Sequence, residues 1–102
     1  MIVHMVLLKI RPDAPAKKVA EAFAAVGALQ QRIPGITSYS WGPYSSPEGF
    51  NKGFTHGFCM TFRDAQARDG YLPHPEHEKV KAQLLGLLAG GLDGAVAFDY
   101  AA

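Results

Sequence analysis

The stretch from Ile2 to Ile10 constrains the fold more than any other part of the chain, because it is apolar on both of its faces. Ile, Val, Met and Leu dominate it, and Arg11-Pro12-Asp13 ends it, which is typical of a β-strand. Alternate residues of a strand point to opposite faces of its sheet, so both faces of this strand must be covered. Helices of the same chain can cover one face, and we expect a second subunit to cover the other.

A helix and two strands are predicted next. Asp13 is a candidate N-cap for the helix, whose apolar stripe runs to Ile33. A second strand is predicted from Ile36 to about Tyr44, and a third from Phe54 to Phe62 after a long, turn-rich loop. Large and small residues alternate along the third strand, so one of its faces is packed and the other carries only small side chains.

The last third of the chain supplies two more helices and a closing strand. Asp64 caps a short helix that reaches Tyr71, and Pro75 begins a longer helix that Gly90-Gly91 ends. Ala95 to Tyr100 is the closing strand. The order strand, helix, strand, strand, helix, strand predicts an α+β ferredoxin-like sandwich, β-α-β-β-α-β, with a four-stranded antiparallel sheet whose helices cover one face.

The uncovered face of this sheet is the predicted homodimer interface. It should use the odd-numbered face of the first strand, which carries Val3, Met5 and Leu7. Cys59, on the face of small residues of the third strand, is expected to contribute as a buried structural thiol. The second strand, with its aromatic Tyr39 and Trp41, is expected to contribute as well.

Composition narrows the class of protein and of partner. The 102 residues, 48% of them hydrophobic, can bury one modest core, so a single domain spanning 1–102 is expected. A net charge of +1, with no run of Lys or Arg, argues against nucleic acid or a membrane surface as partner. The single cysteine and the lack of a signal-like N-terminus favour the cytoplasm.

The segment from Tyr71 to His77 concentrates the candidate chemistry, because it holds a phenol and two imidazoles between and beside two prolines. Each proline favours an extended conformation in the residue before it, which fixes the backbone here. Imidazole titrates near neutral pH, and a phenol can orient a carbonyl group or donate a proton. We therefore interpret Tyr71 and His77 as a candidate acid–base pair. The alternative is a histidine that only ties two elements together.

The other three histidines have different expected roles. His74 lies between the prolines and is expected to be a cap or turn residue; a metal shared with His77 lacks a clear third ligand, so neither metal nor cofactor is predicted. His4 and His56 are expected on the helix-covered face, at opposite ends of two antiparallel strands. His4 is then the companion of the Tyr71–His77 segment. His56 is expected to be a structural hydrogen-bonding residue at the long loop.

Several dispersed segments resemble the stress-responsive α/β-barrel (Dabb) family, in the same order over nearly the whole chain. They are Val3-His4-Met5-Val6-Leu7-Leu8-Lys9, Ile33-Pro34-Gly35-Ile36, Ser46-Pro47-Glu48-Gly49 with Asn51-Lys52-Gly53-Phe54-Thr55-His56, the Tyr71–His77 segment and Phe98-Asp99-Tyr100. The resemblance implies a ferredoxin-like protomer that pairs sheet to sheet as a dimeric α/β barrel. It also implies similarity to small heme-free monooxygenases and lyases, to boiling-stable plant oligomers and to polyketide-cyclising proteins.

The polyketide-cyclising members of that family suggest roles for four residues. Their acid–base pair is a tyrosine and a histidine that match Tyr71 and His77, and their pocket histidines match His4 and His56. They also carry a pocket tyrosine in the first helix at the place where this sequence has Val26, so the sequence departs from their pattern there.

Two functions are compatible with these observations. One is a small-molecule-binding, cofactor-independent lyase, cyclase or monooxygenase that acts on an apolar oxygenated substrate, with Tyr71 and His77 transferring protons. The other is a non-catalytic oligomeric stress-response protein. A cavity with unpaired polar groups would favour the enzyme. The expected walls of its pocket are Phe23, Val26, Phe58, Met60, Leu84 and Leu87.

Overall fold

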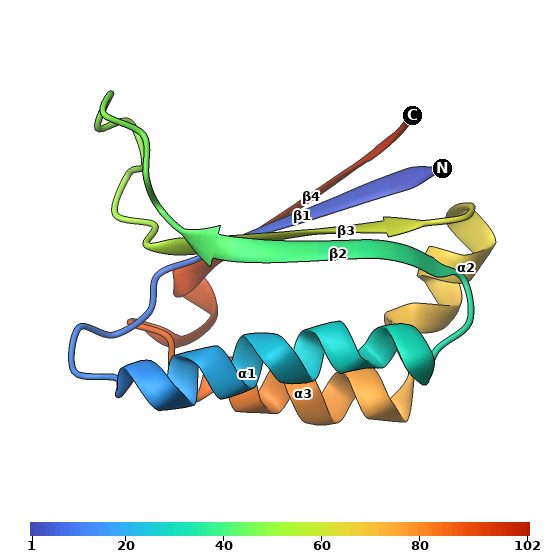
Figure 1. Ribbon diagram of the computed structural model, residues 1–102, viewed down its shortest axis with the longest axis horizontal. Helices are drawn as coiled ribbons and strands as arrows, with labels where there is room; N and C mark the ends of the chain where they lie inside the picture. Colours follow the sequence, from blue (N-terminus) through green and yellow to red (C-terminus); the bar gives the residue numbers. More distant parts are fainter.

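The computed structural model describes residues 1–102 and has two layers, a sheet and a set of helices over one of its faces (Figure 1). The strands are β1 (Ile2–Leu8), β2 (Ile36–Pro43), β3 (His56–Phe62) and β4 (Ala95–Ala101); the helices are α1 (Ala16–Ala28), α2 (Ala65–Tyr71) and α3 (Pro75–Leu85), with 3-10 helices η1 (Leu29–Gln31) and η2 (Gly91–Gly94). All strand pairs are antiparallel, in the order β2-β3-β1-β4. The predicted ferredoxin-like α+β fold is confirmed.

The core lies between the sheet and the helices. The predicted stripe of α1, with Val19, Phe23 and Val26, is buried against the sheet. From β3, Met60 and Phe62 reach the same layer, because every second strand residue points to one face. Each fully buried side chain of this size contributes about 2 kcal/mol of hydrophobic stabilisation, so this layer fixes the helices on the sheet. No helix of the chain has both the length and the hydropathy of a membrane span.

The start of α1 differs from the prediction. Its N-cap residue is Pro15, which makes no side-chain cap, while Asp13 accepts a hydrogen bond from Nε of Arg11 (3.3 Å). A capping side chain must sit directly before the first helical residue to reach the free N–H groups. Asp13 lies too early in the chain for that, so its predicted role as N-cap is wrong.

The starts of α2 and α3 are as predicted. Oδ1 of Asp64 accepts a hydrogen bond from the backbone N–H of Ala67 (2.8 Å), and Nδ1 of His74 accepts one from the N–H of Glu76 (3.1 Å). Pro75 is the first residue of α3, where its missing N–H has no helical partner to lose. His74 is therefore a helix cap, and Nδ1 of its ring is occupied by a hydrogen bond from the backbone.

Three boundaries were predicted too generously. β1 ends at Leu8 and β3 begins at His56, because beyond Leu8 the chain pairs with the segment after α3, with Lys9 N donating to Gly94 O (2.7 Å). α3 ends at Leu85, and the predicted stop at residues 90 and 91 instead reverses the chain with positive φ angles of 76° and 62°, which suit glycine.

The second face of the sheet carries no helix, and its exposed apolar side chains come from β1 and β4. They are Met5, Leu7, Val96, Phe98 and Tyr100, which we call the open-face patch. Phe98 is 61% exposed. Grouped apolar side chains of this kind mark a surface that binds another protein.

β2 does not contribute its aromatic residues to the open face, contrary to the prediction. The Tyr39 hydroxyl donates to the backbone oxygen of Phe23 (2.8 Å), and the Trp41 ring stacks on that of Phe23 with centroids 4.4 Å apart, both on the helix side. The cause is an irregular register between Ile36 and Ser38. One extra residue in a strand moves every later side chain to the opposite face of the sheet. Tyr39 and Trp41 therefore face the helices instead of the open face.

Candidate functional site

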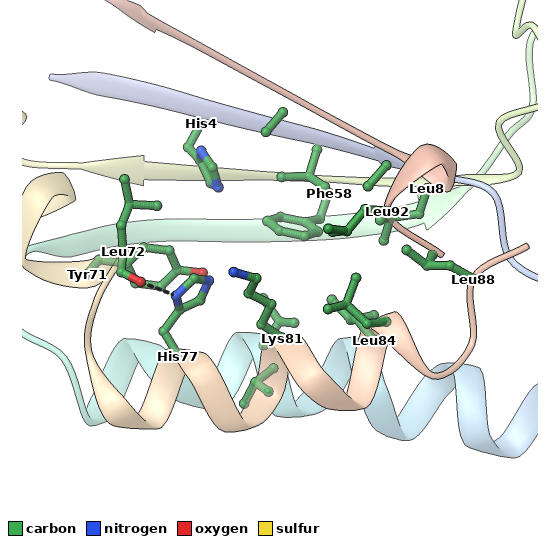
Figure 2. A pocket seen from close by; sticks show the side chains of 16 residues that line it. His4, Leu8, Phe58, Tyr71, Leu72, His77, Lys81, Leu84, Leu88 and Leu92 are labelled. Atoms are coloured by element: carbon green, nitrogen blue, oxygen red, sulfur yellow. Dashed lines mark hydrogen bonds between the residues drawn. The ribbon is translucent and has the colours of Figure 1, made fainter. Parts of the chain in front are cut away.

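A cavity of about 220 Å³ lies between α3 and the part of the sheet formed by β1, β3 and β4 (Figure 2). Its histidines and its tyrosine gather at the end near α2, where His4, Tyr71 and His77 come together. The opposite end is apolar and is formed by Leu8, Leu84, Leu88 and Leu92. The cavity is thus divided into a polar end and an apolar end.

His77 lies in the first turn of α3 with its ring fixed by the chain before the helix. Its Nδ1 is 2.8 Å from the backbone oxygen of Leu72, and a carbonyl oxygen only accepts, so Nδ1 carries the proton. Burial lowers the pKa of His77, and the charge of Lys81 acts in the same direction, outweighing the bond to Leu72 and the nearby Glu78. The ring is therefore neutral at pH 7, and Nε2 is left as a proton acceptor.

Tyr71, the last residue of α2, is 1% exposed, and its ring packs on that of His77 with centroids 4.2 Å apart. Burial raises the pKa of the Tyr71 phenol, so the hydroxyl keeps its proton. That hydroxyl makes no hydrogen bond within the protein. Every side-chain polar atom that is fully shielded from solvent does make one, so the hydroxyl is not fully shielded. It must therefore open on the cavity, as Figure 2 shows.

His4 projects from β1 into the same end of the cavity and is held from behind by a carboxylate. Its Nδ1 lies 2.5 Å from Oδ1 of Asp99 on β4, and Oδ2 of Asp99 lies 2.9 Å from Nη1 of Arg68 on α2. Burial by itself would raise the pKa of Asp99, but hydrogen bonds from His4 and Arg68 outweigh it and lower that pKa. An ionised carboxylate only accepts hydrogen bonds, so Nδ1 of His4 donates and its Nε2 is left for the cavity.

Asp99, Arg68 and Lys81 are site residues that the sequence analysis did not identify. Asp99 pairs directly with His4 across β1 and β4, a register that the antiparallel order of the first and last strands could have indicated. Arg68 precedes Tyr71 by about one helical turn, and Lys81 follows His77 by four residues on the same helix face. Helical spacing from the two candidates would have found both.

The predicted pocket walls fall into two groups. Val26, Phe58 and Leu84 line the cavity. Phe23 and Met60 are completely buried and lie outside its lining. Leu87 also lies outside the lining, whereas Leu88, which follows α3 and forms an isolated β-bridge with Ile10, belongs to it.

His56 is not brought to the cavity. It pairs with Leu8 at the far end of β1 and lines a separate groove together with Trp41. Its Nδ1 lies 2.9 Å from Oγ1 of Thr55, which also accepts a hydrogen bond from Ile10 N (2.9 Å). Burial lowers the pKa of His56. Its contacts tie β3 to the chain after β1, as a structural residue would.

The fold and the site together define an α+β protein of the ferredoxin-like type, with a bare apolar sheet face and a partly polar cavity under its helices. The chain belongs to the stress responsive A/B barrel domain (Dabb) family, whose model matches residues 2–102.

Known proteins and structures similar to this chain cover most of its length. It is 27% identical over 97 residues to the stress-response A/B barrel domain-containing protein HS1 of Arabidopsis thaliana, spanning 95% of this chain and 85% of that protein. It is 26% identical over 74 residues to olivetolic acid cyclase of Cannabis sativa, spanning 72% and 73%. A dimeric ferredoxin-like protein of unknown function from Jannaschia sp. CCS1 superimposes with a TM-score of 0.89 at 29% identity, covering 99% of this chain and 98% of the other.

Proposed function

We propose that this Dabb-family protein binds a small, apolar, oxygenated molecule in the cavity and catalyses a proton transfer on it, as a cofactor-independent lyase or cyclase does. The observation that carries the proposal is the Tyr71 hydroxyl, which opens on the cavity and has no partner in the protein, although the Tyr71 ring is buried beside Phe62 and His77. Because this hydroxyl is open to the cavity and unpaired, it is available to donate a hydrogen bond to a ligand oxygen. A purely structural role accounts for the buried ring of Tyr71 but not for a hydroxyl that faces the cavity without a partner.

The roles of Tyr71 and His77 in the proposed reaction follow from their protonation. Neutral His77 takes a proton from the substrate through Nε2, because its lowered pKa leaves that nitrogen free at pH 7. Tyr71, which keeps its proton, donates a hydrogen bond to the substrate oxygen on which negative charge develops. The proton on His77 then returns to the product or to a leaving group. The similarity to olivetolic acid cyclase supports chemistry of this class.

His4 is the third polar group of the proposed site. Asp99 and Arg68 hold its ring, so Nε2 presents a fixed hydrogen-bonding position from the sheet side of the cavity, opposite α3. A ligand oxygen between sheet and helix would meet His4 on one side and the Tyr71–His77 pair on the other, which restricts its orientation.

We further infer that the active form is a cytoplasmic homodimer joined through the open-face patch. The patch supports this assembly because it is apolar and unpartnered within the chain, and the similar Jannaschia protein is described as dimeric. A homodimer is expected both for the enzyme and for a non-catalytic oligomer. Only the chemistry of the cavity can therefore distinguish the two functions.

Proton transfer can be tested without knowing the natural substrate. Small alkyl and aryl ketones incubated with the protein in D2O should gain deuterium beside the carbonyl, as measured by mass spectrometry or NMR. His77→Gln should abolish the exchange and Tyr71→Phe should reduce it about 10²-fold, as expected for loss of one general acid–base or oxyanion contact. The proposal is overturned if no ketone or related oxygenated compound binds or exchanges, or if both variants retain the wild-type rate.

A further inference from the structure

Lys81 is the only lysine, arginine, aspartate or glutamate among the residues that line the cavity. It lies on α3 one helical turn after His77, between the polar and the apolar end (Figure 2). In that view its ammonium group points into the cavity instead of following the outer surface of the helix. A cation in this position meets whatever ligand spans the two ends.

Within the protein, Lys81 is only weakly paired. Its Nζ lies 3.9 Å from Oε1 of Glu78, and both side chains are about half exposed (46% and 52%). Exposed ion pairs of this geometry hold each other weakly and are screened by salt. The ammonium group is therefore available to a ligand, while the apolar stem packs along the cavity wall.

The neighbouring Lys79 provides a comparison, because it is a lysine of α3 that does not reach the cavity. It is 75% exposed, lies 3.8 Å from Glu76, and takes no part in the lining. The two lysines share one helix and one type of i,i+3 ion pair. They differ in whether the cavity is within reach.

We propose that Lys81 binds the carboxylate of the ligand, so that the cavity takes small, apolar monocarboxylic acids; this inference rests on the proposed function, because it concerns the same cavity. The acid group would lie against Lys81, and the hydrocarbon part would extend among Leu84, Leu88 and Leu92. A volume of about 220 Å³ holds roughly seven water-sized groups, which fits an acid of the size of hexanoate or benzoate.

A monoanion fits this site better than a phosphate does. Lys81 supplies a single positive charge, and the guanidinium of Arg68 is already bound to Asp99 and Asp69. The first turn of α3 offers little to an anion, because His74 caps it and Glu76 and Glu78 place negative charge there. A dianion would therefore meet a single cation, which already has the carboxylate of Glu78 3.9 Å away.

The test compares hexanoate with 1-hexanol, a neutral molecule of the same chain length, by isothermal titration calorimetry and by the ring-proton NMR signals of His77. Wild-type protein should bind hexanoate at least tenfold more tightly than 1-hexanol at low salt, and added NaCl should weaken only the acid. Lys81→Gln should weaken hexanoate about tenfold and leave 1-hexanol unchanged, whereas Lys79→Gln should change neither. Lys81→Arg, which keeps the charge, should retain the preference.

Each result decides between the two proposals. Equal affinity of wild-type protein for both probes, or an equal effect of the Lys79 and Lys81 substitutions, overturns the role of Lys81 and leaves the cavity as a neutral binding site. If neither probe moves the His77 signals, both the proposed binding function and this inference fall. Because Lys81 is half exposed, Lys81→Gln should fold normally, and an unchanged melting temperature verifies this.

Discussion

At the scale of single residues, local rules identified the centre of the site but not its support. Tyr71, His77 and His4 could be chosen from the sequence, since two prolines and a helical stripe fix the first two and strand alternation fixes the third. Asp99 and Arg68 were not chosen, because finding them needs the register between the first and last strands and the helical spacing from Tyr71; they act through contacts between residues 95 and 31 positions apart along the chain. Such contacts exist only after the strands have paired.

Replacing Asp99 should change the tautomer of His4. In Asp99→Asn the amide can donate to Nδ1, so that nitrogen no longer has to carry the ring proton. We expect ¹⁵N NMR of His4 to show the proton moving to Nε2, and we expect a loss of stability of about 1–3 kcal/mol from the disturbed buried network. Asp69→Asn is the matched control, since Asp69 also binds Arg68 (2.8 Å) but is far more exposed. A His4 spectrum that is unchanged in Asp99→Asn would show that the carboxylate does not set the tautomer.

The lowered pKa values of His77 and His56 predict a loss of stability in mild acid. Their pKa values lie below 6.5 in the folded protein and near 6.5 in the unfolded chain. Between the folded and unfolded values the unfolded chain binds more protons, so the free energy of unfolding falls as the pH drops through 6.5. Asp99, whose pKa is lowered from 3.8, adds a second loss only at more acidic pH.

Urea unfolding at about pH 7.5 and about pH 5.5 measures this effect. The wild-type midpoint should be lower at the acidic pH, and the double variant His56→Gln/His77→Gln should show a smaller difference between the two conditions. An equal pH dependence in wild-type and variant protein would assign the effect to other groups.

At the scale of the elements, the order and type of the strands and helices followed from hydrophobic periodicity, but one strand was assigned to the wrong face. An irregular register at Ile36 and Ser38 turns Tyr39 and Trp41 towards α1. Nothing in the local sequence marks this insertion, because a β-bulge needs no special residue here. A single such step reverses the facing of the rest of the strand.

The corrected facing of β2 can be tested by substituting the two faces separately. Trp41→Ala should lower the free energy of unfolding by about 1–3 kcal/mol, because it removes a ring stacked on Phe23 while Trp41 stays 40% exposed. It should leave self-association unchanged, because the ring lies on the helix side. Ser40→Ala, on the open face, should have little effect on unfolding. A Trp41→Ala protein of wild-type stability that no longer self-associates would restore the original assignment.

At the scale of the whole molecule, the apolar character of β1 on both faces already required a cover on each side. The structure supplies one cover, the helices, and shows that β4 widens the uncovered surface with Phe98 and Tyr100. The sequence analysis placed Met5 and Leu7 of β1 correctly on that surface, whereas Val3, which it also named, is already buried within the chain. It overlooked β4, since alternation along a short closing strand does not say which face is bare. An interface of an obligate dimer buries on the order of 2,000 Å² or more, which requires most of this face.

Self-association through the open-face patch is the last prediction. Sedimentation at micromolar concentration should give twice the 11.0 kDa mass of the chain for the wild type. Phe98→Glu should give the monomer, because it places a charge from each subunit in an apolar, two-fold interface. Ala24→Glu adds the same charge on the exposed side of α1 and should remain dimeric. A wild-type protein that sediments as a monomer would contradict the assembly. A monomeric Phe98→Glu that still binds hexanoate would show that each cavity works without its partner.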